Sequence, residues 1–99
     1  MNLSELTYEM NKFVEQQGWY SLGSKRPQTS RNLAISLALE AGEVLEHLQW
    51  GEIVTDKQAF AGELADVALY LLQLAQVTGI DLEEAIQNKL KINESRTWD

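Results

Sequence analysis

Two pairs of acidic residues, each set inside an apolar helical pattern, constrain most strongly what this chain can fold into. Glu40 with Glu43, and Glu63 with Asp66, have the i, i+3 spacing that places two side chains on one face of a helix. Like charges at this spacing repel each other, and apolar surroundings add a desolvation cost. A divalent cation would offset both costs, so the pairs predict a metal site shared by two neighbouring helices.

The apolar spacing before and around the first pair predicts two helices. Asn2 and Glu5 can form a capping box that opens the first helix, and Gly18 ends it. Ser30 is the expected N-cap of the second helix, which would run to about Trp50.

Two more helices are expected in the second half of the chain, over residues 57–77 and 82–96. Thr55 or Asp56 would cap the third helix, and Asp81 with Glu84 would form a capping box for the fourth. No segment alternates with the period of a strand. We therefore predict an all-α fold: one domain, residues 1–99, built as a four-helix bundle.

Composition narrows the function classes. The net charge of −7 argues against binding to a nucleic acid polymer, and the absence of cysteine rules out disulfides, thiolate ligands and a cysteine nucleophile. The N-terminus has neither the basic region nor the apolar run of a signal peptide. The most apolar window, residues 64–80, looks too short and too polar for a membrane span. We expect a cytoplasmic protein with no membrane contact.

The one long loop, residues 18–30, holds Trp19, Tyr20, Lys25 and Arg26. It can be a surface loop with aromatic anchors. It can equally be a ligand flap that supplies a stacking ring and a cation, because binding residues often lie on such loops.

The predicted fourth helix changes character along one face, from apolar Leu82 and Ile86 to Lys89, Asn93 and Arg96. These last three side chains can donate hydrogen bonds to a phosphate. If that face points inward, it forms a cationic wall opposite the acidic pairs. Magnesium prefers oxygen ligands and retains waters that a phosphate can replace, so the combination predicts a Mg²⁺–phosphate site.

Each of these residues also has a plainer interpretation. The chain holds 15 acidic residues, and such pairs arise readily on solvated helices, so a non-enzymatic helical interaction module is an alternative. His47, one turn beyond Glu43, can be a structural residue or a ligand. Tyr70, one turn beyond Asp66, can be a core residue or can bond a phosphate.

The order of these motifs resembles that of a known family, the MazG-like all-α nucleoside triphosphate pyrophosphohydrolases. The dCTP pyrophosphatase-like branch is the most similar part of it. The resemblance covers about residues 31–96 and rests on Arg31-Asn32-Leu33, Glu40, Glu43, Glu46, His47, Trp50, Glu63, Asp66, Tyr70, Gly79, Asp81, Lys89, Asn93 and Arg96.

The resemblance implies Mg²⁺-dependent hydrolysis of a nucleoside triphosphate to the monophosphate and pyrophosphate, in a house-cleaning role. It also implies a homodimer or homotetramer with sites formed across subunits. Glu43 or Glu46 would accept the proton of the attacking water. The remaining implied roles are metal ligation by Glu40, Glu43, Glu63 and Asp66, phosphate binding by Tyr70, Lys89, Asn93 and Arg96, and base binding by Trp19 and Trp50.

One segment departs from the dCTP-preferring branch. Residues 19–31 are longer than the corresponding loop there and lack the histidine that usually follows its tryptophan. The sequence therefore leaves the preferred base open, and another pyrophosphate-containing nucleotide is an alternative substrate for the same fold.

Overall fold

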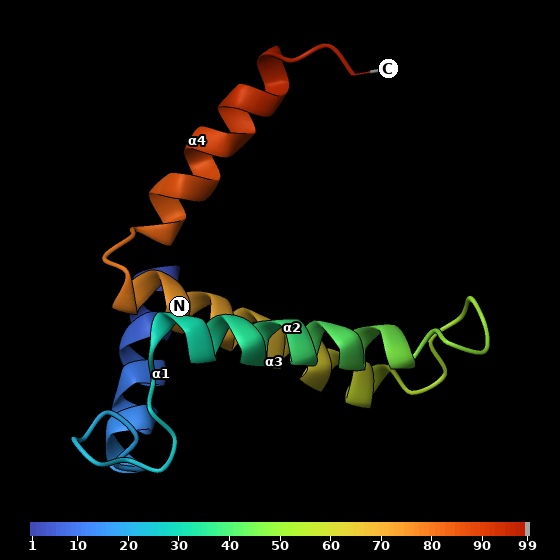
Figure 1. Ribbon diagram of the computed structural model, residues 1–99. Helices are drawn as coiled ribbons and strands as arrows, with labels where there is room; N and C mark the ends of the chain where they lie inside the picture. The colour runs from blue at the N-terminus through green and yellow to red at the C-terminus, as the bar shows by residue number, and fades with distance from the viewer. Residues whose placement is uncertain (99) are drawn as a thin grey trace.

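The computed structural model describes residues 1–98, which form four α-helices and no strands (Figure 1). The predicted all-α class and the number of helices are confirmed. The helices are α1 (Leu3–Gln16), α2 (Ser30–Glu46), α3 (Lys57–Val77) and α4 (Leu82–Ser95).

Local capping explains most of the helix ends. The Asn2 side chain accepts a hydrogen bond from the Glu5 amide at 2.9 Å, and the Glu5 carboxylate accepts one from the Asn2 amide at 3.3 Å, which completes the predicted capping box. The Asp56 and Asp81 side chains cap α3 and α4 by accepting backbone amides. Gly79 follows α3 with a φ of 74°, the left-handed conformation that favours glycine.

The two ends of α2 differ from the prediction. Thr29, not Ser30, is the N-cap, and its hydroxyl accepts the Asn32 amide at 3.1 Å. The helix ends at Glu46, and residues 47–50 form turns. The backbone there makes tighter i→i−3 hydrogen bonds, including one from Leu48 to Leu45 at 2.9 Å. Such tightening is a common way for a helix end to satisfy its last carbonyls.

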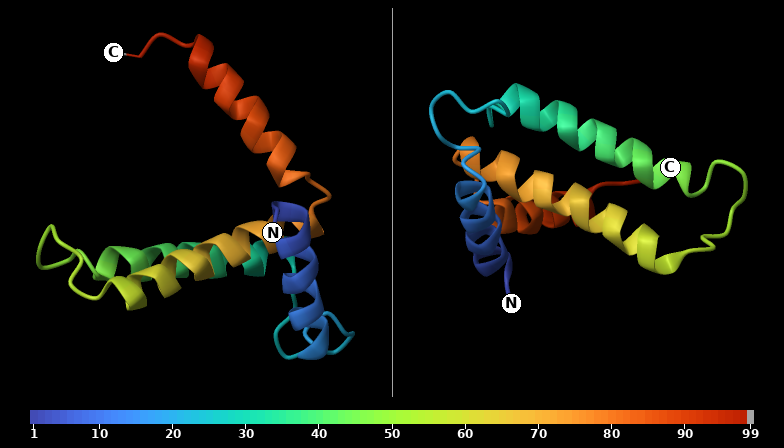
Figure 2. Two further views of the ribbon diagram at one scale, coloured as in Figure 1. Left: turned by 180° about the vertical axis from the view of Figure 1, so that it is seen from behind. Right: turned by 90° about the horizontal axis from the view of Figure 1, so that it is seen from below.

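Three of the helices pack together. α2 and α3 lie side by side and antiparallel, and α1 crosses α3 near the end where α2 begins (Figures 1 and 2). Buried apolar side chains gather at that crossing, where Met10, Val14 and Leu72 form a cluster. Leu33 is the most deeply buried large side chain, at 2% exposure. The core therefore lies at one end of the α2–α3 pair.

α4 projects away from the other three helices (Figures 1 and 2). The prediction that one chain closes as a four-helix bundle was therefore wrong, and so was the placement of the α4 face opposite the acidic pairs. Only the start of α4 reaches the core, where Leu82 packs against the cluster of α1 and α3 side chains. Further along α4, Ile86, Leu90 and Ile92 are about half exposed.

α3 is apolar on several sides. By length and composition it is the one helix in residues 1–98 that could cross a membrane, so the argument that its apolar window is too short was wrong. It nevertheless carries Glu63 and Asp66, which are costly within a bilayer. Leu64, Leu69 and Leu71 are nearly half exposed on it. Like α4, α3 presents apolar surface that this chain alone leaves uncovered.

Candidate functional site

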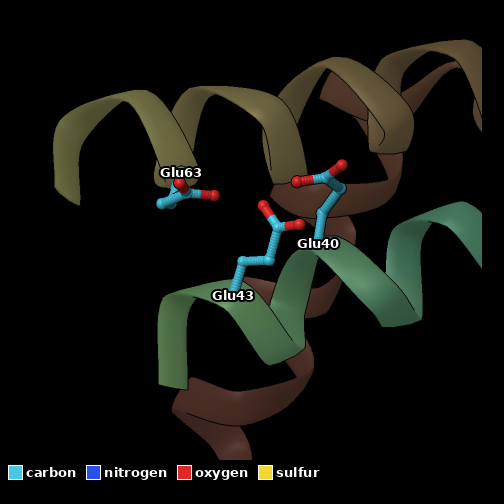
Figure 3. A group of neighbouring side chains, drawn as sticks. All are labelled: Glu40, Glu43 and Glu63. Atoms are coloured by element: carbon cyan, nitrogen blue, oxygen red, sulfur yellow. The ribbon is translucent and has the colours of Figure 1, made fainter. Parts of the chain in front are cut away.

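Three of the four predicted metal ligands meet between α2 and α3. Carboxylate oxygens of Glu40, Glu43 and Glu63 lie within 4.8 Å of one another. Figure 3 shows the three side chains reaching from the two helices into the space between them. The connection between α2 and α3, residues 47–56, is longer than predicted because α2 ends early, yet the two helices pack as antiparallel neighbours. This packing brings the two halves of the acidic motif together.

The electrostatics of this cluster suit a cation. Glu40 Oε2 and Glu63 Oε2 are buried and have no hydrogen-bond partner in residues 1–98. Burial first, and then the adjacent Glu43, raise the pKa of Glu40. The contact with Glu43 first, and then burial, raise the pKa of Glu63. Three carboxylates lie close together, and two of them have an oxygen without a hydrogen-bond partner. Such a set of oxygen ligands fits a hard divalent cation such as Mg²⁺.

Other predicted residues border this cluster. His47 Nε2 lies 4.0 Å from Glu63 Oε1, and its ring packs edge-on against Phe60 with centroids 5.5 Å apart. Asp66 lies one turn beyond Glu63, and its charge contributes to the raised pKa of Glu63. Asp66 and Glu46 are exposed and lie outside the group of three. Their assignments as fourth ligand and general base stay predictions.

A pocket of about 690 Å³ opens beside the acidic cluster, lined by α1, the loop of residues 17–29, α2 and α3. Its volume is in the range of small-molecule sites, roughly 300–1,000 Å³. Ser36 and Asp66 line it, and each lies one turn from a residue of the cluster. The pocket therefore lies next to the cluster along α2 and α3, although none of the three clustered glutamates lines it. Its polar lining comprises Glu9, Lys25, Arg26, Gln28, Asn32, Ser36, Asp66, Tyr70 and Gln73.

The loop has features of both interpretations, because Trp19 packs against the core cluster as an aromatic anchor and also faces the pocket. Trp19 lines the pocket together with Lys25 and Arg26. The Trp19 ring packs edge-on against Phe13 with centroids 5.6 Å apart, and Arg26 Cζ lies 5.5 Å from the Trp19 centroid. The loop therefore gives the pocket an anchored aromatic ring and two cations.

Gln73 is a pocket residue that the sequence analysis missed. It is only 4% exposed, and its Nε2 donates to Gln28 Oε1 at 2.6 Å and lies 3.4 Å from the Tyr20 hydroxyl. That hydroxyl donates to Asn11 Oδ1 at 2.6 Å, and burial raises the pKa of Tyr20, which keeps it a donor. The available signal was a polar residue three positions beyond Tyr70 in an otherwise apolar stretch.

Trp50 does not reach the pocket within one chain. It is 91% exposed, in the turns that follow α2. The loop that carries Trp19 precedes α2, at the opposite end of that helix (Figure 1). Seventeen helical residues span about 26 Å, so one chain does not place both rings around the same base.

The predicted phosphate residues of α4 are likewise separated from the cluster, while Tyr70 lines the pocket. Arg96 instead stacks on the C-terminal Trp98, with Cζ 4.2 Å from the ring centroid. Trp98 Nε1 donates to the Asn93 carbonyl at 3.0 Å. Lys89 is exposed on the projecting helix. Within one chain these three side chains therefore lie away from the acidic cluster, and their phosphate role stays a prediction.

Comparison with known proteins identifies the family. Residues 35–98 match the model of the MazG-like family. The crystal structure of a pyrophosphatase from Archaeoglobus fulgidus DSM 4304 superposes with a TM-score of 0.80 at 32% sequence identity, covering 93% of this chain and 88% of that one. The chain belongs to the MazG-like family. The resemblance noted from the sequence is confirmed.

Curated relatives of this MazG-like chain act on nucleotides, as their names state. A dATP/dGTP diphosphohydrolase of Salmonella phage PMBT28 is 51% identical over 47 residues, which are 48% of this chain and 16% of the relative. Human dCTP pyrophosphatase 1 is 36% identical over 75 residues, 67% of this chain and 44% of the relative. The chain spans less than half the length of these two relatives.

Proposed function

We propose that this MazG-like chain hydrolyses a nucleoside triphosphate to the monophosphate and pyrophosphate. The observation that carries the proposal is the cluster of Glu40, Glu43 and Glu63, whose crowded and partly unpaired oxygens adjoin a pocket large enough for a nucleotide. The names of the relatives support the same reaction class. They include purine and pyrimidine substrates, so they leave the base open. We place the activity in the cytoplasm, in a house-cleaning role.

The three clustered carboxylates, with Asp66 beside them, would hold Mg²⁺. The bound ion would supply charge neutralisation on the phosphates and a more acidic water. The chain itself would bind the base in the pocket against Trp19 and orient the phosphates from Tyr70 toward the cluster. Glu43 is exposed within the cluster and suits the acceptance of a proton from water, with Glu46 as the alternative.

We also propose that the chain acts as a homodimer or homotetramer. The half-exposed apolar side chains of α3 and α4 support this, because a second copy would remove them from water. The same contact could bring Lys89, Asn93 and Arg96 of one copy to the acidic cluster of another. It could also bring Trp50 to a partner's pocket. Within residues 1–98 the cations of α4 lie away from the acidic cluster, and this assembly would bring them to it.

The test is pyrophosphate release from a panel of canonical and modified nucleotides with Mg²⁺. Glu63→Gln should abolish release while leaving the helical content unchanged. Glu83→Gln, at an exposed acid in the first turn of α4, is the matched control and should keep full activity. Full activity of Glu63→Gln would contradict the metal assignment. No turnover of any nucleotide, together with no effect of Mg²⁺ on the melting temperature, would favour the non-enzymatic interaction module.

A further inference from the structure

Gln73 is a buried amide with a fixed orientation. Gln28 Nε2 donates to the Arg26 carbonyl at 2.6 Å, which turns Gln28 Oε1 toward Gln73. Gln73 therefore presents Nε2 to Gln28, at 2.6 Å, and directs its second N–H toward the Tyr20 hydroxyl. Both donor positions of this amide are committed, so the network leaves it little freedom to flip.

The carbonyl oxygen of the same amide is unpaired. In the part of the chain that the structure describes, no hydrogen bond reaches Gln73 Oε1. The residue lines the pocket and is only 4% exposed. Gln73 Oε1 is not among the fully buried unpaired polar atoms of the described residues, so this oxygen keeps some accessible surface. A ligand in the pocket that supplies an N–H can therefore pair with it.

We propose that Gln73 reads the base, by accepting a hydrogen bond from an exocyclic amino group of adenine or cytosine. The inference rests on the proposed function and deepens it by naming the substrate class. Trp19, anchored on Phe13, provides an aromatic wall for the base ring. Gln28 acts as a positioning residue, because its carbonyl holds the Gln73 amide in the accepting orientation.

The proposal distinguishes amino bases from their oxo counterparts. Hypoxanthine and uracil present a carbonyl where adenine and cytosine present an amino group. Two acceptors would then face each other in the pocket, and neither would have a donor. A site built to bond one group rejects an analogue that cannot make the bond, so we expect a preference of at least about tenfold for the amino base.

Equilibrium binding tests this directly. The probes are α,β-methylene analogues of dATP and dITP, and of dCTP and dUTP, titrated in Mg²⁺ against the full chain. The wild-type chain should bind each amino analogue about tenfold or more tightly than its oxo counterpart. Gln73→Leu should reduce that ratio to near one. Gln76→Leu, at an exposed amide on the same helix, should leave the ratio unchanged.

A purely structural role of Gln73 would weaken both members of a pair equally and leave the ratio intact, and that result would overturn the proposal. So would a wild-type chain without preference, or one that binds none of the four analogues. If Gln73→Leu does not fold, Gln28→Ala carries the same expectation without altering α3. A Gln73-dependent preference without pyrophosphate release would refute the proposed hydrolysis and support the reading of the base. Hydrolysis without that preference would support the proposed hydrolysis and refute the reading of the base by Gln73.

Discussion

Replacing Glu40 by glutamine should have opposite effects on stability with and without Mg²⁺. The Glu40 carboxylate lies within 4.8 Å of those of Glu43 and Glu63, and one of its oxygens is buried without a partner. In the metal-free protein the substitution removes the charge repulsion of Glu40 with Glu43 and with Glu63. In the presence of Mg²⁺ it removes one of the three clustered ligands.

The magnitude follows from the distances. Two unit charges 4.8 Å apart interact by about 0.9 kcal/mol at the dielectric constant of water, and this lower limit suits a partly exposed site. Two such repulsions give about 1–2 kcal/mol of stabilisation for Glu40→Gln without metal. One kcal/mol corresponds to about 4–8 °C in a domain of this size, so the melting temperature should rise by about 4–16 °C.

With saturating Mg²⁺, the wild-type chain should instead be more stable than Glu40→Gln. A ligand that binds only the folded state stabilises it by about 2.7 kcal/mol at one hundred times its Kd. The wild-type chain should gain this increment. Glu40→Gln should gain much less, because only two of the three clustered carboxylates remain.

The assay is thermal unfolding followed by circular dichroism at one protein concentration, first with a chelator and then with Mg²⁺. Glu83→Gln is the control and should behave as the wild type in both conditions. The reasoning is refuted if Glu40→Gln lowers the metal-free melting temperature and still shows the full wild-type response to Mg²⁺.

Three further predictions follow from the same structure. The raised pKa of Glu40 and Glu63 means that the folded metal-free protein binds more protons than the unfolded one. The stabilisation that these two carboxyl groups contribute is present below their ordinary pKa of 4.5 and is lost as the pH rises through the raised pKa. The urea midpoint of the metal-free protein should therefore fall as the pH rises through this range, and it should fall less in Glu40→Gln. If α4 of one copy completes the site of another, Glu63→Gln and Lys89→Ala should each be inactive alone, while subunits mixed by unfolding and refolding should regain part of the activity. Leu33→Ala, at a side chain only 2% exposed, should cost about 2–5 kcal/mol in urea unfolding, whereas Leu45→Ala at an exposed position should cost far less.

The four helices and the acidic cluster could be predicted from local sequence patterns. Capping by Asn2, Asp56 and Asp81 acts over three residues, and the i, i+3 spacing places each acidic pair on one face, so both are readable locally. The connection of residues 47–56 then allows α2 and α3 to pack as antiparallel neighbours. These interactions span few residues, and competing packing arrangements leave them unchanged.

Which helix surfaces contact each other could be read only from the folded structure. The sequence pattern of α4 indicated a face that points inward, yet the whole helix projects from the other three. A helical pattern shows which side of a helix is apolar, but it does not show what covers that side. Gln73 and Gln28 are 45 residues apart and meet only because the loop folds over α3. The acidic cluster was therefore visible in the sequence, whereas the contact between Gln28 and Gln73 that lines the pocket was not.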